Sequence, residues 1–450
     1  MNRSLLPLFI ASLPLCSFAA PISFREEIAP VLLEHCQACH GPSEQRGGYR
    51  VDTIDLLSRN EDPNSPVLSP NHPEKSALYQ LLISTESDER MPKKAPQLPS
   101  PIIEKVRQWI AEGAHFDTDE RHAPLVELVP PKRYPAAPEN YAAPFPVTAL
   151  AFTPDGKRLL VSGLREIIVR DSSSGELLRR ISNIPTRTFD ILIHPDGSSF
   201  LTAGGSPGES GEIRQYDLAS GTFIRQLAAS TDAFLDVEIS PDGNSLIAAG
   251  ADHSLSIIDM RTGRKSHRLN AHADAVTGLA ISADGKRFAS VGLDRIAKVH
   301  DVSTGKLVNT YREHQAPLFA VGFLPGDELI TAGKDKSVHG WKVADVKKTR
   351  DIAGLGDVFK SALGADSIYL GGASGKVSQA NTEKLSVQRS YDGLTDWVNS
   401  LAVHPSSHSL AAGSHDGKVM VWSTEDGTAR FSIHAQPVSQ TAKTSAAKAR

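Results

Sequence analysis

The sequence predicts a multidomain protein in which a small all-α domain precedes an all-β propeller of seven blades. Two observations carry this prediction. Apolar residues recur at helical spacing within residues 22–116, and a segment of about 40 residues repeats along residues 146–437. At 450 residues the chain is also too long for one ordinary domain, which fits two or three.

The composition excludes some classes of function. The formal net charge is −4, so nothing indicates binding to nucleic acid or to an anionic membrane surface. Beyond the N-terminal stretch, no segment of the sequence is long and apolar enough to be transmembrane. We therefore look for chemistry in individual motifs rather than in the overall charge.

The first residues have the pattern of a secretory signal peptide. Arg3 precedes an apolar run and small residues follow it, so we expect cleavage after Ala19 and a signal peptide of residues 1–19. A lipoprotein anchored through Cys16 is an alternative, although the preceding leucine fits a lipobox poorly. An uncleaved anchor is another, although the run is short for a bilayer. The sequence therefore predicts an exported protein, periplasmic or otherwise outside the cytoplasm.

The central motif is a CxxCH formed by Cys36, Cys39 and His40, the pattern that attaches a c-type haem. Two thiols at this spacing can each bond to a vinyl group of one porphyrin, and His40 can then ligate the iron. The alternatives are a redox dithiol, a disulfide or half of a zinc site. No βαβ pattern surrounds the motif, and no second Cys or His pair follows at zinc-ligand spacing. The sequence therefore predicts one covalently attached haem c.

A small c-type cytochrome needs a second axial iron ligand, and Met91 is the candidate. It lies after the haem motif, in a charged loop before the last predicted helix, where a core methionine is hard to explain. His72 and His35 are the alternatives, and either would give two histidine ligands. Ligation by His40 and Met91 would raise the reduction potential of the haem relative to two histidine ligands and would leave no open position on the iron for oxygen chemistry.

The motifs of this region resemble those of the planctomycete-type cytochrome c domain. They are Pro30 to Leu33, Cys36 to Gly41, Gly47-Gly48, His72 to Leu78, Met91-Pro92 and Trp109 to Ala114. That family usually has Met-Pro-Pro where this chain has Met-Pro-Lys. The resemblance implies one covalent haem on Cys36 and Cys39, with His40 as the proximal ligand and Met91 as the distal ligand.

Prolines punctuate residues 117–145, which predicts a semi-extended linker between the two domains. Residues 125–129 could instead pair as an edge strand on the following domain. At the other end of the chain, residues 438–450 are polar and rich in Ala, Lys and Thr, which predicts a disordered tail.

The repeated unit is an alternating apolar strand followed by a Pro-Asp-Gly type turn and further strands. Its period of about 40 residues is typical of propeller blades. A second strand ends in small residues, and a third ends near Asp or Trp, as at Trp341 and Trp422. The seven copies start near Val147, Phe189, Phe234, Val276, Leu318, Val358 and Val398.

These units resemble the WD-repeat β-propeller, with seven blades of which the sixth is degenerate. An eighth blade would need strands from the linker. In that family His272 and His314 match the Gly-His position, which implies hydrogen bonds to Asp294 and Asp335 inside a blade rather than ligation of haem or metal. A rigid ring of this kind usually binds other proteins.

Together these observations predict an exported c-type cytochrome for electron transfer, whose propeller docks a redox partner or another protein. Two alternatives stay open. A cytochrome c domain before a propeller resembles haem-d nitrite reductases, but the propeller here shows no catalytic triad, phosphate loop or metal-spaced histidines. A haem-based redox or gas sensor would be favoured if Met91 were not a ligand.

Overall fold

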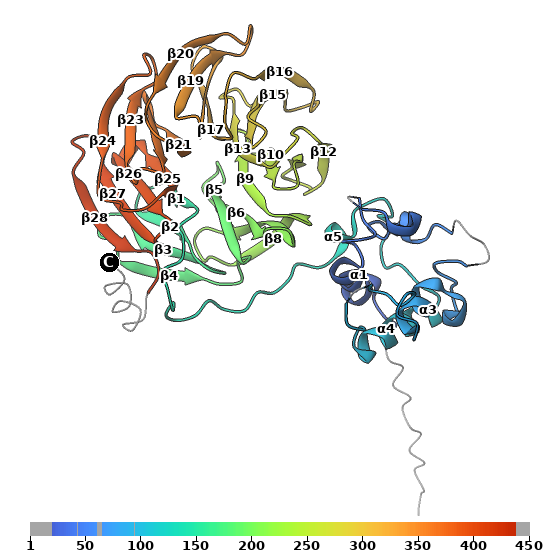
Figure 1. The fold of residues 1–450 in the computed structure, drawn as a ribbon. Helices are drawn as coiled ribbons and strands as arrows, with labels where there is room; N and C mark the ends of the chain where they lie inside the picture. Colours follow the sequence, from blue (N-terminus) through green and yellow to red (C-terminus); the bar gives the residue numbers. More distant parts are fainter. Residues whose placement is uncertain (1–19, 43, 61–64, 94, 438–450) are drawn as a thin grey trace, which may run out of the picture. The chain divides into compact units, whose positions relative to one another are not determined.

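The computed structural model describes residues 20–42, 44–60, 65–93 and 95–437. The predicted signal peptide, residues 1–19, and the predicted tail, residues 438–450, lie outside the described residues. The chain divides into two compact units, Met1–Pro130 and Pro131–Arg450 (Figure 1). Among the described residues, no helix has the length and apolar character needed to span a membrane.

The first unit is built from short helices and loops, as its helical spacing predicts. Its α-helices are α1 (Ala29–His35), α2 (Ile54–Leu57), α3 (Ala77–Ile83), α4 (Ser100–Ala111) and α5 (Leu125–Leu128). The other helical segments are the π-helical turn η1 (Phe24–Ile28) and the 3₁₀ turns η2 (Arg46–Gly48) and η3 (Pro73–Lys75). Helices α3 and α4 lie within residues 22–116, where the sequence predicts helical spacing of apolar residues.

An aromatic cluster forms the centre of this helical unit. The ring centroids of Phe24 and Phe116 are 4.7 Å apart, and Trp109 of α4 lies 5.5 Å from Phe24. The Trp109 indole N–H donates to the carbonyl of His115 (2.9 Å), so its polar atom is satisfied inside the core. The cluster ties α4 to η1, the turn that precedes α1 and the CxxCH segment.

The predicted linker, residues 117–145, is divided between the two units. Its first part belongs to the helical unit, where the Leu125 N–H donates to the carbonyl of Asp52 (2.8 Å). The prediction of an edge strand over residues 125–129 is wrong, because four of these residues form α5. Leu125 and Leu128 lie three positions apart and are both buried in the helical unit, a spacing that suits one helix face and not an alternating strand.

The second part, residues 131–145, is attached to the propeller by two tyrosines, and we call it the strap. Tyr134 Oη donates to Glu212 (2.5 Å), and Tyr141 Oη donates to Glu166 (2.6 Å). Both glutamates are almost completely buried. Arg214, which is fully buried, binds Glu212 (2.5 Å) and also donates to a backbone carbonyl of the strap (2.6 Å).

The second unit is a ring of seven antiparallel four-stranded sheets (Figure 1), which confirms the prediction of a seven-bladed propeller. We number the blades 1 to 7 in chain order. Their strands are β1–β4 (Leu150–Phe152, Arg158–Ser162, Ile167–Asp171, Leu177–Ile181), β5–β8 (Arg187–Ile193, Ser199–Ser206, Ser210–Asp217, Phe223–Ser230), β9–β12 (Phe234–Ile239, Ser245–Gly250, Leu255–Asp259, Lys265–Leu269), β13–β16 (Val276–Ile281, Arg287–Gly292, Ala297–Asp301, Leu307–Tyr311), β17–β20 (Leu318–Leu324, Glu328–Gly333, Ser337–Lys342, Lys348–Ala353), β21–β24 (Val358–Leu363, Ser367–Gly372, Val377–Asn381, Val387–Tyr391) and β25–β28 (Val398–His404, Ser409–Ser414, Lys418–Ser423, Ala429–His434).

The ring closes between blades 7 and 1 without a shared strand, because each sheet takes its strands from one continuous segment. Residues just before β1 span the junction instead. The Val147 N–H donates to the carbonyl of Ser414 (3.1 Å), and the Tyr141 N–H donates to the carbonyl of Pro437 (2.8 Å). The strap contributes no strand to any of the seven sheets, so the alternative of an eighth blade finds no support among the described residues.

The two histidines that match the Gly-His position lie inside their blades, as predicted. His272 Nδ1 lies 3.0 Å from Asp294 and its Nε2 lies 2.9 Å from a serine hydroxyl. His314 Nδ1 lies 2.6 Å from Asp335 and its Nε2 lies 2.8 Å from Thr331. Because both nitrogens of each ring are engaged, these histidines are structural.

We expect Arg214→Met to destabilise the propeller by about 3–5 kcal/mol, because it leaves the buried Glu212 carboxylate without its cation. Denaturant unfolding followed by tryptophan fluorescence measures this change. Arg261→Met, at an exposed position, is the matched control and should stay within about 0.5 kcal/mol of the unchanged protein. Equal unfolding curves for the two variants would contradict the role of Arg214.

Candidate functional site

The CxxCH segment forms a tight turn at the end of α1. The Cys36 N–H donates to the carbonyl of Leu32 (3.0 Å), and the His40 N–H donates to the carbonyl of Cys36 (3.0 Å). Two further backbone bonds close the loop: Arg46 N–H to the Cys39 carbonyl (3.0 Å) and Val51 N–H to the His40 carbonyl (2.8 Å). The backbone therefore holds both cysteines and the histidine in one compact segment.

Gly41 is required where this turn ends. A Cβ atom at position 41 would lie 2.5 Å from the backbone oxygen of Gln37, closer than real Cβ atoms come to other atoms. The neighbour is main chain and cannot move aside without disturbing the turn. The glycine that the sequence places after His40 thus lets the chain fold back closely over the motif.

The predicted ligands line a single cavity of about 370 Å³. Cys36, Cys39, His40 and Met91 all face it, although Met91 lies about fifty residues further along the chain. The cavity volume lies within the range of roughly 300–1,000 Å³ usual for small-molecule sites. The apolar side chains that complete its walls are Val51, Val67, Leu78, Leu81 and Leu82.

Helix α3 positions Met91, because the Met91 N–H donates to the carbonyl of Leu81 at 2.9 Å. Of the alternative ligands, His72 is not among the residues that line the cavity. Its side chain is 52 % exposed, with Nδ1 lying 3.1 Å from Glu74. His35 does line the cavity, beside Cys36. The structure therefore brings together every predicted site residue and leaves out His72.

The other interpretations of the two thiols fit this site less well. Cys36 and Cys39 are free rather than joined in a disulfide. A redox-active cysteine has a lowered pKa, whereas burial raises the pKa of the Cys36 thiol to about 12, with a smaller contribution from Cys39. Among the described residues, no group of three or more His, Cys, Asp or Glu side chains at this site converges as metal ligands would.

The same residues do fit a haem. The His40 ring carries a buried Nδ1 atom with no hydrogen-bond partner among the described residues, beside two free thiols in an apolar cavity. Met91 supplies a thioether sulfur to that cavity. Arg46 and Lys93 also line it and could pair with carboxylates of a bound group. This donor set is the one that a c-type haem requires.

Comparison with known families agrees with both units. Residues 36–95 match the family Planctomycete cytochrome C. Residues 221–259, 263–301, 305–342 and 385–423 match the WD domain, G-beta repeat. The chain joins a planctomycete-type cytochrome c segment to a WD-repeat propeller. A search of curated proteins found no match to the chain.

The four repeat matches begin and end at equivalent positions of their blades. Each begins near the outer strand of one blade and continues through the first three strands of the next blade. The first three strands of blades 1, 2 and 6 fall outside the matches, and blade 6 is the one that the sequence predicts to be degenerate. All three nevertheless form four-stranded sheets like the others, because the strand–turn pattern alone suffices for a blade.

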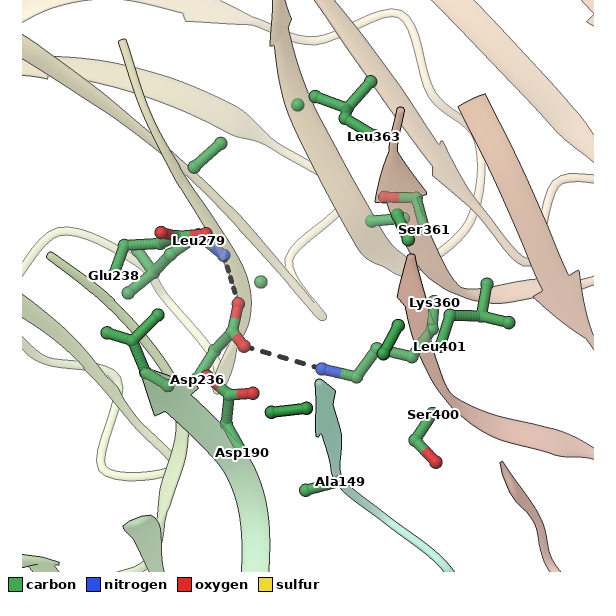
Figure 2. A pocket seen from close by; sticks show the side chains of 18 of the residues that line it. Ala149, Asp190, Asp236, Glu238, Leu279, Lys360, Ser361, Leu363, Ser400 and Leu401 are labelled. Carbon is green, nitrogen blue, oxygen red and sulfur yellow. Dashed lines mark hydrogen bonds and ion pairs between the residues drawn. The ribbon is translucent and has the colours of Figure 1, made fainter. Parts of the chain in front are cut away.

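Sequence reasoning missed a second group of residues, in the centre of the propeller. Asp190 of β5, Asp236 and Glu238 of β9, and Lys360 of β21 line a common cavity of about 500 Å³ (Figure 2). The repeats contain a sequence signal that could have revealed this group. At the position of Asp190, Asp236 and Lys360, the other four blades have the small residues Ala149, Gly278, Ala320 and Ser400.

We expect Gly41→Ala to loosen the CxxCH turn, since the added methyl group would meet the Gln37 carbonyl. Overpacking of this kind costs about 1–3 kcal/mol. Hydrogen–deuterium exchange of peptides covering residues 36–51 measures the effect, and faster exchange at Arg46 and Val51 is the expected result. Ala38→Ser, at an exposed position in the same turn, is the control and should exchange like the unchanged protein.

Proposed function

We propose that this protein is an exported c-type cytochrome that carries one covalent haem and transfers electrons. The observation that supports it most strongly is the convergence of Cys36, Cys39, His40 and Met91 on one apolar cavity. The match of residues 36–95 to a cytochrome c family agrees with this assignment.

In this proposal each residue has a distinct task. The bound haem would supply reversible one-electron exchange. The cysteine sulfurs would tether it, and the His40 imidazole and the Met91 thioether would ligate its iron. With both of these ligands supplied by the protein, the iron would have no position left for a substrate, which favours electron transfer over catalysis. The leucine side chains of α3 exclude water from the cavity.

Export belongs to the same proposal. Covalent haem attachment takes place outside the cytoplasm, and the predicted signal peptide would deliver the chain there. The propeller supplies a rigid platform on which a redox partner or another protein can dock, because each blade is held by its two neighbours. Its WD-repeat segments support a role in protein binding.

The first test is haem staining on a denaturing gel after export in a host with cytochrome c maturation. We expect a stained band for the unchanged protein and none for the double variant Cys36→Ala/Cys39→Ala, because each thioether needs a cysteine sulfur. Cys16→Ala is the matched control and should stain fully, since we expect Cys16 to be removed with the signal peptide. An unstained unchanged protein would refute the proposal.

The second test concerns the distal ligand. We expect Met91→Ala to convert a low-spin six-coordinate absorbance spectrum into a high-spin or water-ligated one while haem stays attached, because the thioether is lost from the iron. His72→Ala should leave the spectrum unchanged, since His72 does not line the cavity. A Met91→Ala spectrum equal to that of the unchanged protein would remove Met91 from the site. A high-spin spectrum of the unchanged protein would favour an enzyme or a gas sensor instead.

A further inference from the structure

The first strand of each blade lines the centre of the propeller, and six of these strands contain a bulge. In β5, Thr188 pairs with Gly204 and Asp190 pairs with Ala203, so Phe189 between them has no pairing partner. The same irregularity leaves one residue unpaired in each of five other blades: Leu235, Thr277, Phe319, Phe359 and Asn399. A bulge redirects the side chain of the unpaired residue.

All six bulged residues line one hollow of about 350 Å³, which we call the channel mouth. Three of them are phenylalanines, and the exposed Trp397 joins them. The ring centroids of Phe319 and Phe359 are 5.6 Å apart, as are those of Phe359 and Trp397. Trp397 is 50 % exposed. A large apolar side chain that is this exposed, beside other apolar side chains, is typical of a surface that binds another molecule.

A positive charge already lies close to two of these rings. The ammonium group of Lys334 lies 5.8 Å from the centroid of Phe319 and 6.0 Å from that of Phe359. A cation over an aromatic face is attracted by the electron density of the ring. The channel mouth is thus an apolar surface that can also hold a cationic side chain.

The residues that follow the bulges line the channel behind this mouth, and their charges are not balanced. Figure 2 shows Asp190, Asp236 and Lys360 directed into a shared space. Lys360 Nζ lies 3.5 Å from Asp236, whereas no ion pair joins Asp190 or Glu238 to a cation among the described residues. Burial, together with the charge of Asp236, raises the pKa of Asp190 to about 7. Burial likewise raises the pKa of Glu238.

The channel differs from the group of side chains that has metal-ligand geometry. Among the described residues, the cluster whose ligand atoms lie within 4.8 Å of one another is His314, Asp335 and His339, and its first histidine is engaged inside blade 5. The channel carboxyl groups do not converge in this way. A long organic cation that enters from the mouth fits the cavity better.

We propose that the channel mouth docks a partner protein through one exposed Lys or Arg side chain. The aliphatic stem of that side chain packs against Phe319, Phe359 and Trp397, and its charged end lies near Asp190 and Glu238. The inference rests on the proposed role of the propeller as a docking platform and adds the chemistry of the partner. An anionic side chain would meet Lys334 and Lys360 at the mouth, but three carboxyl groups in the channel behind it.

The test uses the full-length holoprotein and an array of short capped peptides with every residue type at the central position. We expect binding to concentrate on central Arg or Lys and to weaken about tenfold or more in Asp190→Asn/Glu238→Gln, as when a buried charge loses its partner. Glu383→Gln, an exposed position outside the channel, is the matched control and should bind like the unchanged protein. An array without preference for basic residues would overturn the inference.

A second set of variants does not disturb the interior. Trp397→Ala removes an exposed ring and should also weaken the basic peptides. Lys334→Gln removes an exposed cation from the mouth and should tighten them by about twofold or more, because it removes like-charge repulsion. Weaker binding of the basic peptides by Lys334→Gln would contradict like-charge repulsion at the mouth and overturn the inference.

The pH dependence gives a further readout. Because the pKa of Asp190 is raised to about 7, an Arg peptide should bind more tightly at pH 8, where this carboxyl group is ionised, than at pH 6, where it is mostly protonated. The groups that face it are Asp236, Glu238 and Lys360. A pH-independent affinity would contradict the assignment of the charged end to this cluster.

Two controls separate this inference from binding of a free amine and from the proposed function. Spermidine alone, if it competes as well as the best peptide, would indicate a free amine as the ligand and would overturn docking of a protein. Haem staining of the same preparation tests the proposed function independently. Normal haem with no basic preference refutes the inference alone, whereas absent haem with a basic preference refutes the cytochrome and keeps the docking site.

Discussion

Closure of a ring whose two ends share no strand is the constraint on which the propeller depends. The first and last blades meet without a common sheet, so they are joined by hydrogen bonds from residues 141–147, just outside the blades, and by the Arg170 side chain, which donates to the carbonyl of His434 (3.2 Å). Glu166 and Glu212 hold the strap through Tyr141 and Tyr134. Each buried carboxylate also binds an arginine, which satisfies a charge that would otherwise be costly. The strap is therefore part of the propeller and not a spacer.

The cavity lined by Cys36, Cys39, His40 and Met91 depends on a shorter closure, formed by one stretch of backbone. Hydrogen bonds within residues 36–51 set the positions of Cys36, Cys39 and His40, and α3 brings Met91 to the same cavity. The motif thus supplies three of the four groups locally, and tertiary packing supplies the fourth. The aromatic cluster around Trp109 anchors η1, the turn that precedes α1 and the motif.

Local patterns in the sequence predict most of this molecule, and packing explains what they miss. The CxxCH motif is encoded in one short segment, and the pairing of His272 and His314 with aspartates is encoded within a single repeat of the period of about 40 residues. The route of residues 117–145 is not encoded locally, because proline content says nothing about which surface covers Leu125 or Tyr141. The charged channel leaves only a weak signal, namely charged residues at one position of the repeat, for a similar reason. Asp190 and Lys360 lie 170 positions apart and meet only when the ring closes.

The bulges have a consequence for how such a scaffold can diversify. A bulged residue takes no part in the hydrogen-bond ladder, so its side chain can be exchanged without changing how its blade pairs. Each of six blades therefore contributes one variable side chain to the mouth, in chain order Phe, Leu, Thr, Phe, Phe and Asn. A library that varies only these six positions would keep the architecture constant while changing what the propeller recognises.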